Sequence, residues 1–191
     1  MLMPICSHVD RRTWRIDANA IHIKRHLSDM KGMYHDREAQ AVLEKKNPVI
    51  YEVFTPAMPE LEGHLAYGTS IINPGKVGDE FYMTKGHFHQ KLETAEVYYC
   101  LQGHGYLLMQ TPESEVKAVA LRPGGIVYVP PRWAHRSINV SADRFVTLFV
   151  YPADAGHDYA TIETEGFAQL LVHVNGKPTL VDNPKYARGR D

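Results

Sequence analysis

The chain has few cysteines and no long hydrophobic run, and both features restrict where it works. Only Cys6 and Cys100 occur in 191 residues, and two thiols so far apart in sequence do not make a disulfide framework. No apolar stretch is long enough to span a bilayer, and the N-terminus lacks the apolar core of a signal peptide. We therefore expect a cytoplasmic protein without membrane partners.

The chain also has no excess of positive or negative charge. The 21 basic and 22 acidic residues leave a net charge of −1, and the basic residues form no long run. Such a chain has no overall field that would attract nucleic acid. Internal repeats and low-complexity segments are absent as well. With 44% hydrophobic residues, the chain can bury a sizeable core, and we expect one domain over residues 1–191.

What the sequence does contain is a series of short strands separated by turns. A short N-terminal helix is expected over Asp36–Lys46, capped by Asp36. Many short strands with regular turns predict an all-β sandwich or barrel. Residues 1–26 form an N-terminal extension, and residues 184–191 a loose polar tail. The expected strands are Ala20–Lys24, Val49–Phe54, Leu65–Ile72, Glu80–Met83, Glu96–Leu101, Tyr106–Gln110, Val116–Leu121, Ile126–Val129, Phe145–Tyr151, Leu170–Val174 and Pro178–Val181.

Three histidines and one glutamate form a candidate metal site. His87 and His89 are two positions apart, so in a strand both side chains point to the same face. Glu96 begins the next expected strand, and His135 follows a turn rich in glycine and proline. Imidazole and carboxylate ligands together suit first-row metals such as Fe, Mn, Ni or Zn. A single histidine is more often a surface or hydrogen-bonded residue than a ligand, but the combination favours a metal site.

These residues resemble the two sequence motifs of the cupin superfamily. Residues that match the first motif are His87, His89, Glu96 and Gly103, and those that match the second are Gly124, Pro130, His135 and Asn139. Two departures stand out. Six residues separate His89 from Glu96, where three or four are usual, and Arg132 stands where a glycine is common. The resemblance implies a cupin jelly roll, which agrees with the strand pattern.

The longer spacing points to a subgroup, the cupin-type glucose-6-phosphate isomerases of archaea and some bacteria. Stretches similar to that family include Leu27–Met30, Thr84–His89, Ala95–Tyr98, Trp133–Arg136 and Tyr151–Tyr159. The resemblance implies a metal-dependent aldose–ketose isomerase that interconverts glucose 6-phosphate and fructose 6-phosphate, in glycolysis and gluconeogenesis. We expect proton transfer through an enediol, and the sequence leaves a hydride shift open as the other route.

The same resemblance implies one divalent metal ion per subunit. Fe²⁺ comes first, with Mn²⁺, Ni²⁺, Co²⁺ or Zn²⁺ as alternatives. The implied ligands are His87, His89, Glu96 and His135.

The isomerisation moves a proton between C1 and C2 of the open sugar, so it requires a base. Glu96 is the candidate, either as ligand and general base together or as a ligand only. Tyr98 lies two residues later and shares the face of Glu96 in a strand. His157 is a candidate for ring opening or contact with a sugar hydroxyl, and the alternative is an ordinary loop histidine.

The resemblance also implies substrate contacts, and local chemistry adds candidates for the phosphate. Ser70 stands at a position where the family uses Thr for phosphate, and it keeps the hydroxyl. Thr84 and Gly86 precede the metal ligands and offer a hydroxyl and a backbone N–H. Lys85 between them is either a phosphate contact or a solvated lysine. The full expected substrate-binding set is Tyr51, Ser70, Thr84, Gly86, Tyr98, Tyr151 and Tyr159.

Two other functions stay open on these residues. Three His and one Glu also suit a dioxygenase or an oxalate-type decarboxylase, and jelly rolls also serve as non-catalytic sugar-binding domains. The expected partners are a sugar phosphate and a second copy of the chain. A homodimer is implied by the resemblance and is consistent with the apolar Ile21 and Ile23 near the N-terminus.

Overall fold

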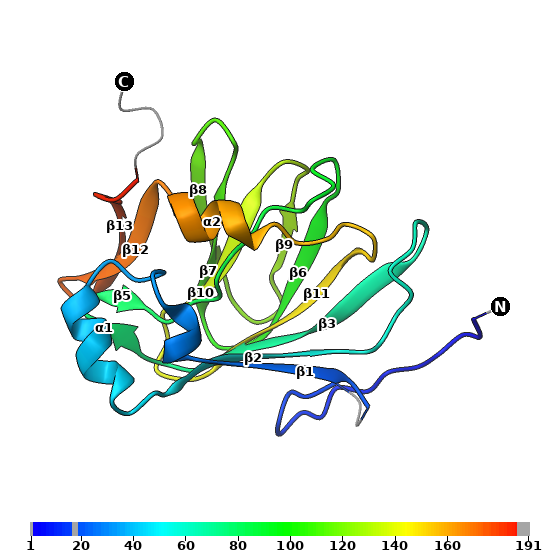
Figure 1. The fold of residues 1–191 in the computed structure, drawn as a ribbon. Helices are drawn as coiled ribbons and strands as arrows, with labels where there is room; N and C mark the ends of the chain where they lie inside the picture. The colour runs from blue at the N-terminus through cyan, green and yellow to red at the C-terminus, as the bar shows by residue number, and fades with distance from the viewer. Residues whose placement is uncertain (1, 17–18, 187–191) are drawn as a thin grey trace.

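The computed structural model describes residues 2–16 and 19–186, and its strands form three antiparallel sheets (Figure 1). The largest sheet has the spatial order β1-β2-β3-β11-β6-β9. Its strands are β1 (Ile21–His26), β2 (Val49–Thr55), β3 (Leu65–Ile72), β11 (Phe145–Pro152), β6 (Glu96–Gln102) and β9 (Ile126–Val129).

The two smaller sheets complete the all-β architecture. The three-stranded sheet has the order β10-β7-β8, with β10 (Ala134–Asn139), β7 (Gly105–Gln110) and β8 (Val116–Leu121). The four-stranded sheet has the order β13-β12-β5-β4, with β13 (Lys177–Asp182), β12 (Gln169–Val174), β5 (Glu80–Phe81) and β4 (Lys76–Val77). The sequence did not predict β4 or β10, whereas its other expected strands match strands of the structure.

The main core joins the largest sheet to the three-stranded sheet. Tyr98 and Phe149 from the first, and Leu107 and Ile138 from the second, belong to one cluster of buried side chains. Two packed layers around one core are what strands with one apolar face require. The expected all-β jelly-roll sandwich is therefore confirmed.

Strand β6 shows how the sequence pattern sets the inner face. Glu96, Tyr98 and Cys100 are buried, whereas Val97 and Tyr99 between them are 37% and 38% exposed. Successive side chains of a strand point to opposite faces, so Glu96 and Tyr98 both face the interior. Cys100 is a free thiol in this buried row.

Two α-helices and a 3₁₀ turn accompany the sheets. The expected N-terminal helix is α1 (Arg37–Glu44), and the Asp36 side chain accepts a hydrogen bond from Ala39 N at 2.8 Å. The 3₁₀ turn η1 spans Leu27–Met30. The sequence did not predict α2 (Tyr159–Glu165), which begins at the Asp158 cap and ends before Gly166. At seven residues, α2 is too short to show a clear helical period.

Within the N-terminal extension, for which the sequence predicted only a short strand, residues 9–16 pack on the outer face of the largest sheet. Ile16 is buried against Phe54, Ile71 and Val146. The hydroxyl of Thr69 donates a hydrogen bond of 2.8 Å to the Trp14 carbonyl. This segment therefore covers apolar sheet surface that would otherwise be exposed.

The expectation of a loose tail from residue 184 does not hold where the structure describes the tail. Tyr186 is buried, and its hydroxyl lies 2.6 Å from Ser114 Oγ. Residues 187–191 of the expected tail lie outside the described part of the chain. A single aromatic anchor is difficult to detect in a polar sequence, because its burial depends on a distant loop.

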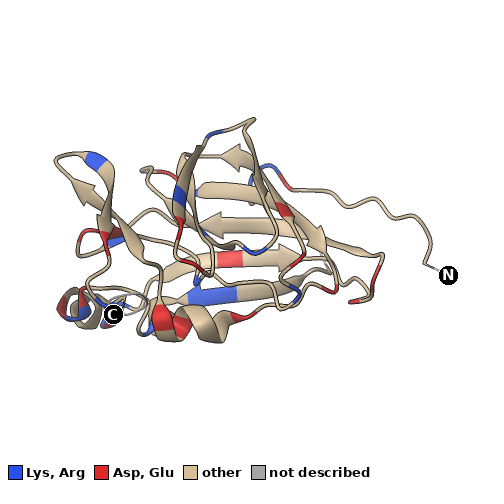
Figure 2. Ribbon diagram, turned by 90° about the horizontal axis from the view of Figure 1, so that it is seen from above, with Lys and Arg blue, Asp and Glu red and all other residues tan. Residues whose placement is uncertain are grey.

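Charge is distributed without a dominant sign over the described residues. Figure 2 shows basic and acidic segments interspersed along the ribbon. None of the described helices is both long and apolar enough to cross a membrane.

Candidate active site

The four predicted metal ligands come from three separate parts of the chain. His87 and His89 lie in the segment between β5 and β6, Glu96 begins β6, and His135 lies on β10. Two backbone hydrogen bonds join His87 to His135, from His87 N to His135 O (3.3 Å) and from His135 N to His87 O (3.1 Å). This isolated bridge holds the two motifs side by side.

The ligand atoms of these four residues converge. One donor atom from each lies within 4.8 Å of the others. Glu96 Oε2 is 2.9 Å from His135 Nε2 and 3.1 Å from His89 Nε2. His87 Nε2 is buried and has no hydrogen-bond partner. A buried imidazole nitrogen without a partner, facing a carboxylate and two further imidazoles, fits a site for a divalent metal ion.

Hydrogen bonds on the far side of the rings orient two of the histidines. His89 Nδ1 lies 2.8 Å from Thr94 Oγ1, whose own proton goes to the Lys91 carbonyl at 2.6 Å. His89 therefore donates from Nδ1, which leaves its Nε2 lone pair for a metal. His135 Nδ1 likewise donates to the Trp133 carbonyl at 3.3 Å, which leaves its Nε2 lone pair free. Such outer contacts commonly set the tautomer of metal-binding histidines.

Thr94 also explains the long spacing between His89 and Glu96. The extra residues form a turn in which Thr94 N donates to Lys91 O at 3.1 Å, and this turn returns the Thr94 side chain to the His89 ring. Sequence reasoning did not identify Thr94 as a site residue. The unusual spacing was the available signal, because extra residues beside a ligand need a structural use.

The protonation states of the group suit metal binding. Burial lowers the pKa of His87 well below its ordinary value, and His135 and His157 lower it further. Burial alone would raise the pKa of Glu96, but His135 and then His89 outweigh it and hold that pKa well below the usual range. A neutral imidazole and an ionised carboxylate are the forms that coordinate metal ions.

His157 is brought beside the metal ligands by a second backbone bridge. Phe88 and Asp158 exchange hydrogen bonds, Asp158 N to Phe88 O at 2.8 Å and Phe88 N to Asp158 O at 3.2 Å. The His157 ring lies 4.5 Å from the His87 ring between centroids. Burial lowers the pKa of His157, so the ring is neutral at physiological pH.

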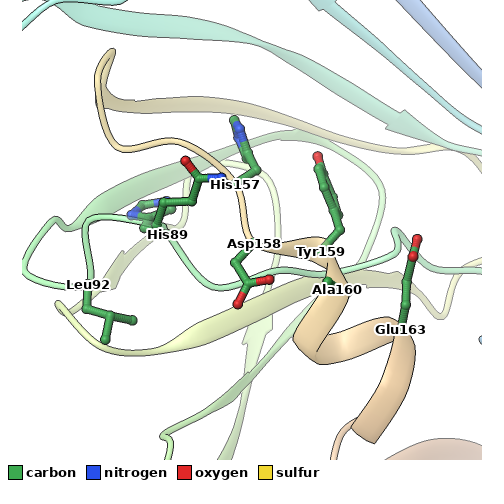
Figure 3. A pocket seen from close by; sticks show the side chains of 8 residues that line it. His89, Leu92, His157, Asp158, Tyr159, Ala160 and Glu163 are labelled. Atoms are coloured by element: carbon green, nitrogen blue, oxygen red, sulfur yellow. The ribbon is translucent and has the colours of Figure 1, made fainter.

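An open pocket of about 620 Å³ lies against this group. His89 and His157 line it, together with residues at the start of α2. Figure 3 shows His157 and Tyr159 extending to one side of their segment, while Asp158 points to the opposite side. Asp158 Oδ1 accepts from Thr161 N at 3.2 Å and caps α2. The cap thus fixes the helix start from which Tyr159 projects.

The predicted tyrosines also gather around the group. Burial, followed by the charge of Glu96, raises the pKa of Tyr98 well above its ordinary value. Burial raises the pKa of Tyr151 and of Tyr159 to about 12 each. Burial also raises the pKa of Tyr51. All four phenols are therefore protonated at neutral pH.

The predicted phosphate contacts lie in different surroundings. Ser70 Oγ is buried without a hydrogen-bond partner on the inner face of β3. Thr84 Oγ1 accepts a hydrogen bond from Ser137 N at 3.0 Å. Gly86 is buried with a φ of +78°. Lys85 forms an ion pair with Glu163 at 2.7 Å.

Arg136 supports the backbone at Gly86. Its guanidinium donates to the Lys85 carbonyl and stacks 4.4 Å from the centre of the Phe167 ring. A Cβ at Gly86 would lie 3.0 Å from side-chain atoms of both Arg136 and Phe167. The glycine is therefore required both for its backbone conformation and for this close packing.

Comparison with known proteins identifies the family. A family model described as glucose-6-phosphate isomerase matches residues 24–187. A glucose-6-phosphate isomerase of Thermococcus litoralis is 52% identical over 169 residues, covering 88% of this chain and 89% of that protein. One of Pyrococcus furiosus is 46% identical over 186 residues, covering 97% and 98%. One of Sinorhizobium medicae is 37% identical over 192 residues, covering 98% and 89%.

Similarity to solved structures is weaker. A Lactobacillus farciminis oxalate decarboxylase superposes with a TM-score of 0.44 at 16% identity, covering 57% of this chain and 30% of that chain, which is too distant to bear on function. The family match extends over most of the chain and includes all four residues of the converging ligand set. The chain belongs to the glucose-6-phosphate isomerase family.

Proposed function

We propose that the protein interconverts glucose 6-phosphate and fructose 6-phosphate through an enediol and depends on a divalent metal ion. Its relatives are named for this isomerisation. One observation supports a catalytic role for this site. The buried carboxylate of Glu96 is held ionised among three imidazoles, beside the phenol of Tyr98.

Glu96 is the proposed general base. Both of its contacts to imidazoles involve Oε2, so its second oxygen is the one proposed to remove the proton from C2 and return it to C1. A positioned base of this kind typically contributes 10²- to 10⁴-fold to the rate. Tyr98 is proposed to donate to Glu96 or to a sugar oxygen, since its phenol stays protonated.

His157 is proposed to assist ring opening or to contact a sugar hydroxyl. Its ring is stacked with Tyr159 at 5.7 Å between centroids and lines the pocket. A neutral imidazole can accept a proton at one nitrogen and donate from the other, as ring opening requires. Tyr151 and Tyr159 are proposed to position the open sugar, and Tyr51, Ser70, Thr84 and Gly86 to hold its phosphate.

The metal ion is proposed to be held by His87, His89, Glu96 and His135. Bound there, it would act as a Lewis acid towards the sugar oxygens and stabilise the negative charge of the enediolate. We propose Fe²⁺, with Mn²⁺, Ni²⁺, Co²⁺ or Zn²⁺ as substitutes, because mixed imidazole and carboxylate ligands suit these ions.

A coupled assay tests the proposal. The formation of glucose 6-phosphate from fructose 6-phosphate is followed with a coupling dehydrogenase, before and after the protein is stripped with a chelator and desalted. We expect stripping to abolish turnover and the candidate metals to restore it to different degrees. The coupling enzyme, assayed alone after the same treatment, is the control. Full activity in metal-free protein would contradict metal dependence.

Absence of isomerisation with every metal would contradict the proposed activity itself. Oxygen uptake with small organic acids would then indicate a dioxygenase, and sugar binding without turnover would indicate a binding domain. Mannose 6-phosphate is tested in the same assay as a second substrate.

We further propose a cytoplasmic homodimer acting in glycolysis and gluconeogenesis. Strand β1 forms an edge of the largest sheet, and Ile21 and Ile23 on it are 56% and 39% exposed. An apolar sheet edge of this kind favours pairing with a second copy. Light scattering at micromolar concentration should give twice the chain mass of 21.7 kDa, and a monomer mass would refute the dimer.

A further inference from the structure

The phosphate contacts expected from the sequence include only one side-chain cation. Ser70, Thr84 and Gly86 are neutral, as is Tyr51 beside them in the proposed site. The one cation, Lys85, forms an ion pair with Glu163 at 2.7 Å. A phosphate dianion is most strongly bound by charge-assisted hydrogen bonds, and a guanidinium provides them in pairs. A lysine or arginine from another part of the chain would therefore be needed to neutralise the phosphate.

Arg25 on β1 lies beside Tyr51, where a cation could reach the phosphate of the substrate. It is the direct partner of Tyr51 in the antiparallel pairing of β1 with β2. Directly opposite residues of an antiparallel pair project from the same face of the sheet. Arg25 therefore shares the inner face with Tyr51, while the neighbouring Lys24 is paired with Glu52 and lies on the outer face.

The side chain of Arg25 has unused hydrogen-bonding capacity next to the site. Its Nε is buried and has no hydrogen-bond partner. Within the described part of the chain, no carboxylate forms an ion pair with Arg25. A buried guanidinium N–H without a partner is uncommon in native proteins and indicates that a ligand can supply the missing acceptor.

The charge of Arg25 lowers the pKa of two phenols of the site, Tyr51 and Tyr159. Burial raises the pKa of Tyr51, and Arg25 is the strongest influence in the opposite direction. Burial and the neighbouring tyrosines likewise raise the pKa of Tyr159, and Arg25 again opposes them. Tyr159 comes from α2 and Tyr51 from β2, so the charge of Arg25 acts on phenols from two different elements.

We propose that Arg25 is the cation that binds the phosphate group of the sugar substrate. This inference depends on the proposed function, since it assigns a further residue to the same site. Arg25 donates from Nε and a terminal nitrogen to two phosphate oxygens, while the phenols donate to the remaining oxygens. The N-terminal segment thus contributes to substrate recognition as well as covering the sheet.

Two substitutions at Arg25 and one control test the proposal. Arg25→Met removes the charge and both donors, and Arg25→Lys keeps the charge but removes the paired donor geometry. Lys24→Met is the control, because Lys24 precedes Arg25 on β1, is exposed and faces away from the site. The metal-loaded proteins are compared by KM and kcat for fructose 6-phosphate, and by the competitive inhibition constant of inorganic phosphate.

We expect Arg25→Met to raise both KM and the phosphate inhibition constant by about 10- to 100-fold, the usual range for a charged hydrogen-bond pair. The change in kcat should be smaller, and Arg25→Lys should recover part of the loss. Lys24→Met should leave all three constants within about twofold. Unchanged KM and phosphate inhibition in Arg25→Met, with an unchanged melting temperature, would overturn the proposal, as would a loss confined to kcat.

Direct calorimetric titration with inorganic phosphate separates this inference from the proposed function. If the wild-type protein binds phosphate but isomerises no sugar phosphate, the proposed function fails, and loss of phosphate binding in Arg25→Met still supports the assignment. If wild type and Arg25→Met bind phosphate equally, the assignment fails whatever the activity. If Arg25→Met does not fold, the same comparison is made with Arg25→Lys, for which unaltered phosphate affinity would overturn the paired-donor contact.

Discussion

Replacing Glu96 with glutamine distinguishes a general base from a metal ligand that plays no part in proton transfer. Glu96 Oε2 contacts His135 at 2.9 Å and His89 at 3.1 Å in a fully buried position. Glutamine has nearly the same shape and keeps one carbonyl oxygen for these contacts, but its amide accepts no proton at neutral pH. Glu96→Gln therefore removes the base while leaving a possible ligand atom.

The two roles predict effects of different size. Loss of a general base lowers kcat by about 10²- to 10⁴-fold, which corresponds to about 3–5 kcal/mol of transition-state stabilisation. Loss of one negative ligand weakens metal affinity, and activity then returns when metal is raised to saturation. Because His87 is held neutral and no second carboxylate belongs to the described ligand group, we expect the larger, unrecoverable loss.

The assay measures kcat and bound metal on the same Glu96→Gln sample across a metal titration. Glu93→Gln is a matched control, since Glu93 lies in the same loop, is 76% exposed and pairs with Arg132 at 3.3 Å. Its kcat should stay within about twofold of wild type. Near-normal turnover of fully metal-loaded Glu96→Gln would refute the base assignment and direct attention to Tyr98 or His157.

Three further substitutions test how the fold supports the site. Gly86→Ala should destabilise the protein by about 2 kcal/mol and raise KM, because Gly86 has a left-handed backbone and an added Cβ would make contacts of 3.0 Å. Gly124→Ala is the control, since Gly124 has a φ of +86° but open space around it. In thermal melts it should show only the cost of the backbone conformation. Leu107→Ala should cost about 2–5 kcal/mol in denaturant unfolding, since Leu107 is fully buried, and a cost below 1 kcal/mol would contradict its place in the core. Asp158→Ala should cost about 1 kcal/mol through loss of the α2 cap and raise KM by displacing Tyr159, and an unchanged KM would show that the cap does not position that residue.

Local patterns in the sequence were sufficient to predict most elements and the residues of the metal group. The alternation in β6 placed Glu96 and Tyr98 on one face, and the two-residue spacing placed His87 and His89 together. These features depend on the side-chain period of a strand and on turn chemistry, which are properties of neighbouring residues.

Only the tertiary structure showed how distant segments are held together at the site. The bridge between His87 and His135, the position of His157 at the capped start of α2, and the pairing of Arg25 with Tyr51 all join residues far apart in the chain. Their partners are selected by packing and by hydrogen bonds across sheets, so no local period reports them. The same reason explains why the sequence did not reveal the role of Thr94 beside His89, the burial of Tyr186, or the packing of the N-terminal segment on the outer sheet face.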